Sequence, residues 1–212
     1  MFALVNKSDN SITRMLSGNQ GITVDGVQHP KAIFSLWTES ERNAINIYEV
    51  EMDTSKKKDG KWYVNTNITY SFDGTNATGS YGDATAKAHA DTLWTEQDKT
   101  DGKILEGKDV GDVAVKGLKT VLIEQVKSQA ESELNKTDWY VTRKSEKSTA
   151  IPSAVTTHRD AVRTKQASME TSITNASDTP ALETLYAVVN TADEGEPPVY
   201  ARPIGYIPIK DF

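Results

Sequence analysis

The side chains that could carry out chemistry are few in this sequence and lie far apart. The three histidines, His29, His89 and His158, occur in no HxxxH or HxH arrangement, so a metal site would need distant carboxylates to converge on them. There is no cysteine, which excludes disulfide bonds, thiolate zinc sites and cysteine nucleophiles. No segment matches GxSxG, GxxxxGK[ST], GxGxxG or the DxDxDG calcium loop. We therefore expect no catalytic residues, no metal site and no cofactor, and a protein that is not an enzyme.

The composition is acidic and moderately polar. The formal net charge is −6, and the only basic run, Lys56 to Lys58, is best explained as a solvated loop, so we expect no nucleic-acid partner. No apolar run approaches the roughly 18 residues that a membrane span requires, and the first residues lack the basic and apolar regions of a signal peptide. The mean hydropathy of −0.54 suggests that part of the chain is exposed or held by a partner.

Residues 1–82 are expected to form a β-rich module. Asp25-Gly26 favours a tight hairpin turn, and Thr38 followed by Glu41 has the spacing of a capping box at the start of a short helix. Apolar residues from Trp62 to Phe72 recur mostly at every second position, as in a half-buried strand. Residues 73–76 then supply a turn to a return strand at 77–81.

Residues 83–112 are expected to be a linker with one short helix at 84–93, and residues 113–190 a helical hairpin region. Asp112 is expected to cap the first helix, which has one apolar stripe: Val115, Leu118, Leu122, Val126, Ala130 and Leu134. A second helix is predicted at 153–175. Its apolar stripe is too thin for an isolated helix, so it should pack on the first helix or on other copies of the chain. A third helix is expected to start at Thr179, with Thr179 as its cap and Pro180 in the first turn.

Residues 191–212 are expected to form an extended, proline-rich arm. Four prolines keep this segment out of helices and central strands. The apolar residues between and after them predict a surface that seeks a partner: Val199, Tyr200, Ile204, Tyr206, Ile207, Ile209 and Phe212. The expected fold class is therefore α+β, with a small N-terminal β-rich module, a C-terminal α-helical hairpin and this arm.

The stretch from Leu134 to Arg163 has the most distinctive spacing. Its first helix ends in the pattern Leu-x-x-Thr-Asp-Trp, and two arginines lie four residues apart on the second helix. This region resembles the C-terminal part of bacteriophage tail-fibre assembly and related tail-associated proteins; the matching positions are Leu134, Thr137, Asp138, Trp139, Arg159 and Arg163. The chain departs from that pattern at His158, where an aromatic residue is common, and at Val162, where leucine is frequent. Residues 21–47 also resemble the openings of marine-phage tail-region proteins.

The same residues have a structural interpretation that needs no family. Thr137 and Asp138 can end the first helix and accept hydrogen bonds there. Trp139 is expected to be buried, folded over the open end of the hairpin. Arg159 and Arg163 can pair with Asp138 or Glu133 across the hairpin, which would create a docking surface.

The resemblance implies a non-enzymatic structural or adaptor protein of the virion, located in the viral tail at the fibre or baseplate and made in the host cytoplasm. Its partners would be other phage tail proteins and further copies of the chain, with no nucleic acid and no membrane. Two alternatives stay open. One is a tail-fibre assembly chaperone that is absent from the mature particle, and the other is a carbohydrate-binding tailspike module.

Overall fold

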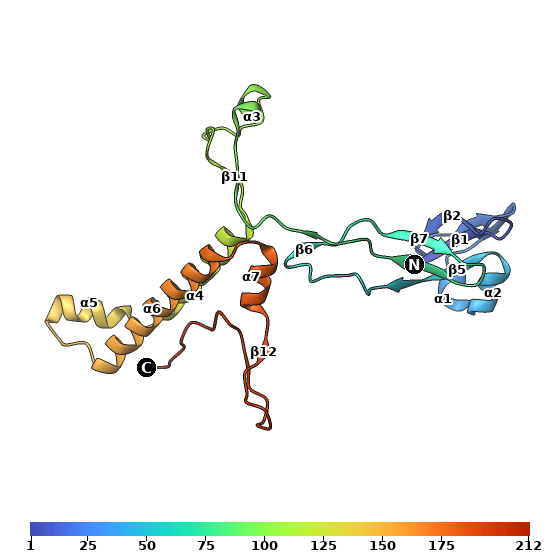
Figure 1. Cartoon of the computed structure of the whole chain (residues 1–212). Helices are drawn as coiled ribbons and strands as arrows, with labels where there is room; N and C mark the ends of the chain where they lie inside the picture. Colours follow the sequence, from blue (N-terminus) through green and yellow to red (C-terminus); the bar gives the residue numbers. More distant parts are fainter. The chain divides into compact units, whose positions relative to one another are not determined.

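The computed structural model describes residues 1–212, which divide into two compact units, Met1–Thr85 and Ala86–Phe212. Figure 1 traces their elements. Helices hold 35% of the residues and strands 21%, so the expected α+β class is confirmed. No helix has the length and apolar character needed to cross a membrane.

Unit 1 is built on a five-stranded sheet in the order β2-β1-β5-β8-β7. The strands are β1 Phe2–Asn6, β2 Ser11–Leu16, β5 Ile47–Asp53, β7 Thr69–Phe72 and β8 Ala77–Ser80. Neighbouring strands are antiparallel except β5 and β8, which run parallel. The edge strands β2 and β7 contact each other, so the sheet curls back on itself.

The sheet separates two apolar clusters because alternate residues of each strand point to opposite faces. Phe2 lies with Ile33 and Ile47 in one cluster, whereas Ala3 and Tyr48 lie in the other. Two short helices, α1 Ile33–Leu36 and α2 Glu39–Ala44, accompany the first cluster. The predicted capping box at the start of α2 is confirmed: the Glu41 amide donates to Thr38 Oγ1, and the Thr38 amide donates to the Glu41 carboxylate at 2.7 Å.

The turn predictions in unit 1 are mostly confirmed. Strands β3 Ile22–Val24 and β4 Val27–His29 form a hairpin whose turn residues, Asp25 and Gly26, both have positive φ. The predicted return strand is β8, antiparallel to β7. The continuous strand predicted from Trp62 to Phe72 is wrong, because β6 covers only Tyr63–Val64 and Asn67 turns the backbone with a φ of 62°.

The boundary between the units falls within β9, Thr85–Ala86, and unit 2 continues with a two-stranded ribbon that carries a short helix at its tip. The ribbon pairs β10 Thr92–Leu93 with β11 Val113–Val115, and α3 is Glu96–Thr100. The helix predicted at 84–93 is therefore wrong, since this segment is used for strand pairing. The helix predicted from residue 113 begins later for the same reason.

The prediction that Asp112 caps the first long helix is wrong, because that helix has no side-chain cap. Helix α4 spans Leu118–Asn135 with Gly117 at its N-cap. The Asp91 carboxylate accepts hydrogen bonds from the Gly117 amide at 2.7 Å and from Thr120 Oγ1 at 2.8 Å, and these bonds lower the pKa of Asp91. Gly117 has no side chain to cap the helix, and the first two helical amides, those of Leu118 and Lys119, donate instead to the Ala88 and His89 carbonyls, each at 3.0 Å.

Helix α6, Ser153–Asn175, packs antiparallel on α4. At one end Lys119 Nζ donates to the Thr174 carbonyl, and at the other Glu133 meets His158. The buried residues between the helices are Leu122, Val126, Ala130, Val155, Val162, Met169 and Ile173. This stripe accounts for the pairing, because each helix alone is only weakly amphipathic.

Helix α7, Thr179–Tyr186, follows α6. Its cap is Asp178, whose carboxylate accepts from the Ala181 amide, so the prediction of Thr179 as the cap is wrong. Thr179 is buried and donates instead to the Lys87 carbonyl at 2.6 Å. Pro180 lies in the first turn, as predicted.

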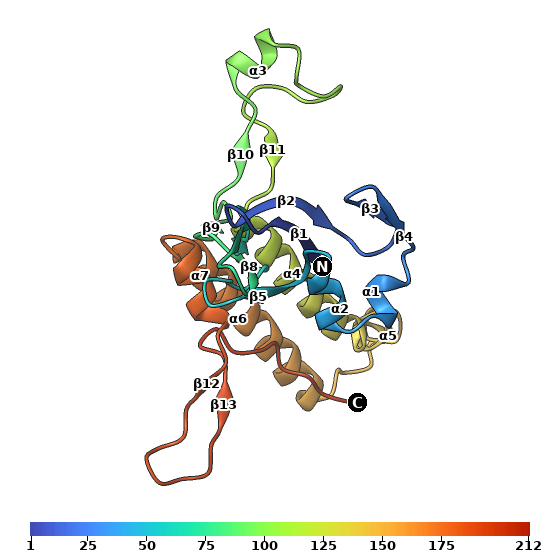
Figure 2. The ribbon, with the colours of Figure 1, turned by 90° about the vertical axis from the view of Figure 1, so that its right-hand side faces the viewer.

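A helix occupies the segment expected to be a polar connection between α4 and α6. Helix α5 spans Asp138–Lys147 and contains several good helix formers, and Ser148 ends it in a left-handed conformation. After α7, β12 Val189–Asn190 and β13 Tyr200–Ala201 form a second ribbon. Figure 2 shows both ribbons of unit 2 leaving its helices, and the chain after β13 returning to them.

Candidate interaction site at the helix pair and the C-terminal arm

A buried carboxylate connects the two long helices to the C-terminal arm. Glu133 Oε1 accepts hydrogen bonds from His158 Nε2 and from the Lys210 amide, each at 2.9 Å. Lys136 Nζ lies 2.6 Å from Glu133 Oε2. We refer to Glu133, Lys136, His158 and Lys210 as the Glu133 cluster.

The electrostatics of this cluster favour an ionised carboxylate. Burial by itself raises the pKa of Glu133, but hydrogen bonds from Lys136, Lys210 and His158 lower it, and the net shift is downward. An ionised Glu133 can only accept hydrogen bonds, so His158 Nε2 carries the proton in this contact. The carboxylate therefore receives donors from the C-cap of α4, from α6 and from the arm, which suits a structural contact.

Arg159 forms a second polar contact beside the first. Its Nη1 donates to the Leu134 carbonyl and to Thr137 Oγ1, each at 2.8 Å, and lies 2.7 Å from Asp138 Oδ1. The predicted Arg159–Asp138 pair is thus present. The guanidinium is a further donor to the Leu134 carbonyl at the C-terminal end of α4, which also accepts from the amide and the hydroxyl of Thr137, each at 3.0 Å.

Arg163 does not make the predicted pair across the helices. It lies 3.4 Å from Asp160 on its own helix, and its side chain is exposed. Both expected acceptors are already engaged, Asp138 by Arg159 and Glu133 by His158. Only one of the two arginines therefore joins the helices.

Trp139 is not the buried cover that the sequence suggested. Its residue exposure is 51%, and its ring meets neighbours on α5, with Tyr140 at 3.7 Å between ring centroids and the Arg143 guanidinium at 4.8 Å from the ring centroid. Trp139 lies in the first turn of α5, so its ring follows that helix. The ring that packs against His158 belongs to Phe212, with centroids 5.2 Å apart.

The C-terminal arm has an inner and an outer face. Ile204 and Ile207 are buried within unit 2, and the Ile204 amide donates to the Leu185 carbonyl at 3.0 Å. In contrast, Ile209 is 80% exposed, and the other apolar residues of the arm are also exposed: Val199, Tyr200, Tyr206 and Phe212. The expectation that all of them face a partner is therefore wrong for Ile204 and Ile207, which have partners in their own unit.

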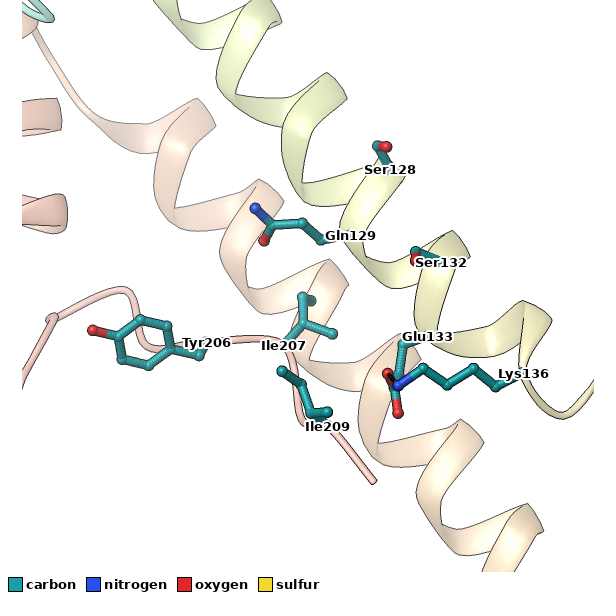
Figure 3. Close-up of a pocket in the computed structure, with 8 residues that line it drawn as sticks. All are labelled: Ser128, Gln129, Ser132, Glu133, Lys136, Tyr206, Ile207 and Ile209. Atoms are coloured by element: carbon teal, nitrogen blue, oxygen red, sulfur yellow. Dashed lines mark ion pairs between the residues drawn. The ribbon is translucent and has the colours of Figure 1, made fainter. Parts of the chain in front are cut away.

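A groove lies between the arm and α4. It has a volume of about 500 Å³ and is lined by Ser128, Gln129, Ser132, Glu133, Lys136, Tyr206, Ile207 and Ile209 (Figure 3). The close-up shows the arm residues on one side and the α4 residues on the other. The lining combines small polar, charged and aliphatic groups, which suits contact with a polypeptide. Neither this groove nor any other part of the chain brings together three His, Asp or Glu side chains that could hold a metal ion.

The sequence interpretation did not find the joint role of Glu133 and His158. A signal for it exists, because both fall at helix positions three or four residues from buried apolar ones: Ala130 for Glu133, and Val155 and Val162 for His158. A polar side chain on a buried stripe must find a partner, so two such residues on paired helices predict a contact.

Comparison of the chain with protein-family models, with curated proteins and with solved structures yields no match. The likeness to tail-fibre assembly proteins is thus a hypothesis that depends on the residues of the Leu134–Arg163 stretch.

Proposed function

We propose that this chain is a non-enzymatic structural adaptor of a bacteriophage tail, which binds other tail proteins at the fibre or baseplate. In this proposal residues 1–82 form a β-rich module, 83–112 a linker with a short helix, 113–190 a helical hairpin region, and 191–212 the arm that contacts neighbours. The chain is made in the host cytoplasm and assembled into the virion with further copies of itself.

The two-faced arm is the observation that carries the proposal. Its inner residues, Ile204 and Ile207, fix the arm on the helices, and the Lys210 amide is bonded to Glu133. Its outer residues, Tyr206 and Ile209, stay in solvent. A segment held by one face and apolar on the other is suited to join two bodies. The exposed Trp139 and Val141 on α5 supply a second apolar surface in the same unit.

Quantitative mass spectrometry of purified particles of the encoding phage tests the proposal. We expect the chain at a fixed stoichiometry to other tail proteins. Absence of the chain from particles that have complete fibres would refute the adaptor function. If, in addition, fibres fail to assemble when the chain is deleted, the result would favour the assembly chaperone. We expect Ile209→Ser to lower incorporation and Glu131→Ser, a matched control at an exposed site on α4, to leave it unchanged.

The carbohydrate-binding alternative receives less support from unit 1. Trp62 and Tyr63, which an aromatic platform would need at the surface, are buried. Glycan-array binding by the purified chain would nevertheless raise this alternative above the adaptor.

A further inference from the structure

The C-terminal arm depends on unit 2 for its structure while having little structure of its own. From Arg202 onwards the one hydrogen bond within its backbone joins the Gly205 amide to the Arg202 carbonyl. Its other attachments are made to helices: the Ile204 amide to α7, the Lys210 amide to Glu133 of α4, and the Phe212 ring to His158 of α6. Such a segment can leave its seat without disrupting a secondary structure element.

The connection to the arm is long enough to reach a second molecule. Residues 188–203 lie between Ala187, the C-cap of α7, and Ile204, and they include the β12–β13 ribbon. This ribbon is short, with two residue pairs, Val189–Ala201 and Asn190–Tyr200. If it opens, the 16 residues can span about 50 Å. An isolated two-stranded ribbon is marginally stable in water, so opening costs little.

We propose that two copies of this chain exchange their C-terminal arms, so that Ile207, the Lys210 amide and Phe212 of one copy occupy the seat beside Glu133 and His158 of the other. The occupant is a second copy because every contact of the seat is already matched to this arm: a buried site for Ile207, an acceptor for the Lys210 amide and a ring for Phe212. An exchanged arm remakes all of these contacts, so the exchange is nearly neutral apart from association itself. This inference deepens the proposed function, since it names one partner of the arm, but it does not depend on location in a tail.

Cross-linking between single-cysteine variants tests the exchange, and the absence of native cysteine makes each introduced thiol unique. Ser132→Cys and Ile209→Cys both line the groove, on α4 and on the arm, and both sites are exposed. Tagged Ser132→Cys is incubated with untagged Ile209→Cys at high concentration and treated with a short bismaleimide. Leu105→Cys, at an exposed site on the β10–β11 ribbon, replaces Ile209→Cys as the matched collision control.

We expect the Ser132–Ile209 product between chains to exceed the Leu105 control by roughly a hundredfold, because docking holds the thiols at a high effective concentration. Native mass spectrometry of the unmodified chain should show a dimer that forms with concentration. The proposal is overturned if the yield of cross-linked product from the mixed single variants stays at the level of the Leu105 control. This holds whether the double variant Ser132→Cys/Ile209→Cys links within one chain or does not link at all. Neither of those results shows whether the chain is present in phage particles, so the adaptor proposal is tested separately.

Discussion

Replacing Glu133 by alanine should release the C-terminal arm while leaving the helix pair folded. The hydrogen bond from the Lys210 amide to Glu133 Oε1, 2.9 Å long, joins residues 77 positions apart and is the arm's last polar attachment. A hydrogen bond to a charged group contributes about 1.5 to 3 kcal/mol. Because about 1.4 kcal/mol corresponds to a factor of ten in an equilibrium constant, amide exchange at Lys210 should become roughly ten to a hundred times faster.

Hydrogen–deuterium exchange followed by mass spectrometry measures this directly, with peptides from the arm compared against peptides from α4 and α6. Glu131→Ala is the matched control, since Glu131 is on the same helix and exposed. Equal Lys210 exchange in the wild type and in Glu133→Ala would refute the assigned contact. Equal acceleration in both variants would show that loss of helix stability, and not loss of the acceptor, releases the arm.

Three further predictions follow from the same contacts. Ile207→Ala should lower the free energy of unfolding of unit 2 by about 2 to 5 kcal/mol, whereas Ile209→Ala should change it by less than about 0.5 kcal/mol. Chemical denaturation measures both values, and equal effects would mean that the arm does not dock by its inner face. The pKa of Glu133 lies below its ordinary 4.5, so the ionised carboxylate stabilises the folded state above pH 4.5 and loses this effect as the pH falls through the folded pKa. Protection of the arm amides from exchange should therefore decline at acidic pH in the wild type but not in Glu133→Gln. Identical exchange-against-pH profiles for the two proteins would contradict this. Arg159→Met should destabilise unit 2 by about 2 kcal/mol, because it removes the donor to buried Thr137 Oγ1 and the cation that pairs with Asp138. Arg163→Met should have an effect below about 1 kcal/mol, and a thermal melt with the reverse order would overturn the assignment.

Local rules predicted the parts of the fold that depend on neighbouring residues. The Asp25-Gly26 turn, the Thr38–Glu41 capping box and the limits of α6 are each set by a few consecutive side chains. The pair between Arg159 and Asp138 was also accessible, because the two residues lie near the ends of segments that the chain brings together.

The missed features depend on pairing between distant segments. The start of α4 was misplaced because Val115 pairs with Thr92 in a ribbon, and because Ala88 and His89 supply the acceptors for the first helical amides from outside the helix. Trp139 was expected to be buried, but its neighbours on α5 stack on it in solvent. The inner face of the arm was missed because no periodic pattern distinguishes Ile207 from Ile209 in a proline-rich segment.

The central claim is that the C-terminal arm is held by one face and binds a neighbour with the other. Hydroxyl-radical footprinting of the free chain and of the chain within purified tail particles tests it most directly. The account predicts that Tyr206 and Ile209 lose reactivity in the particle, while Ile204 and Ile207 are protected in both states. Unchanged reactivity of the outer residues in the particle, or strong reactivity of the inner residues in the free chain, would contradict it.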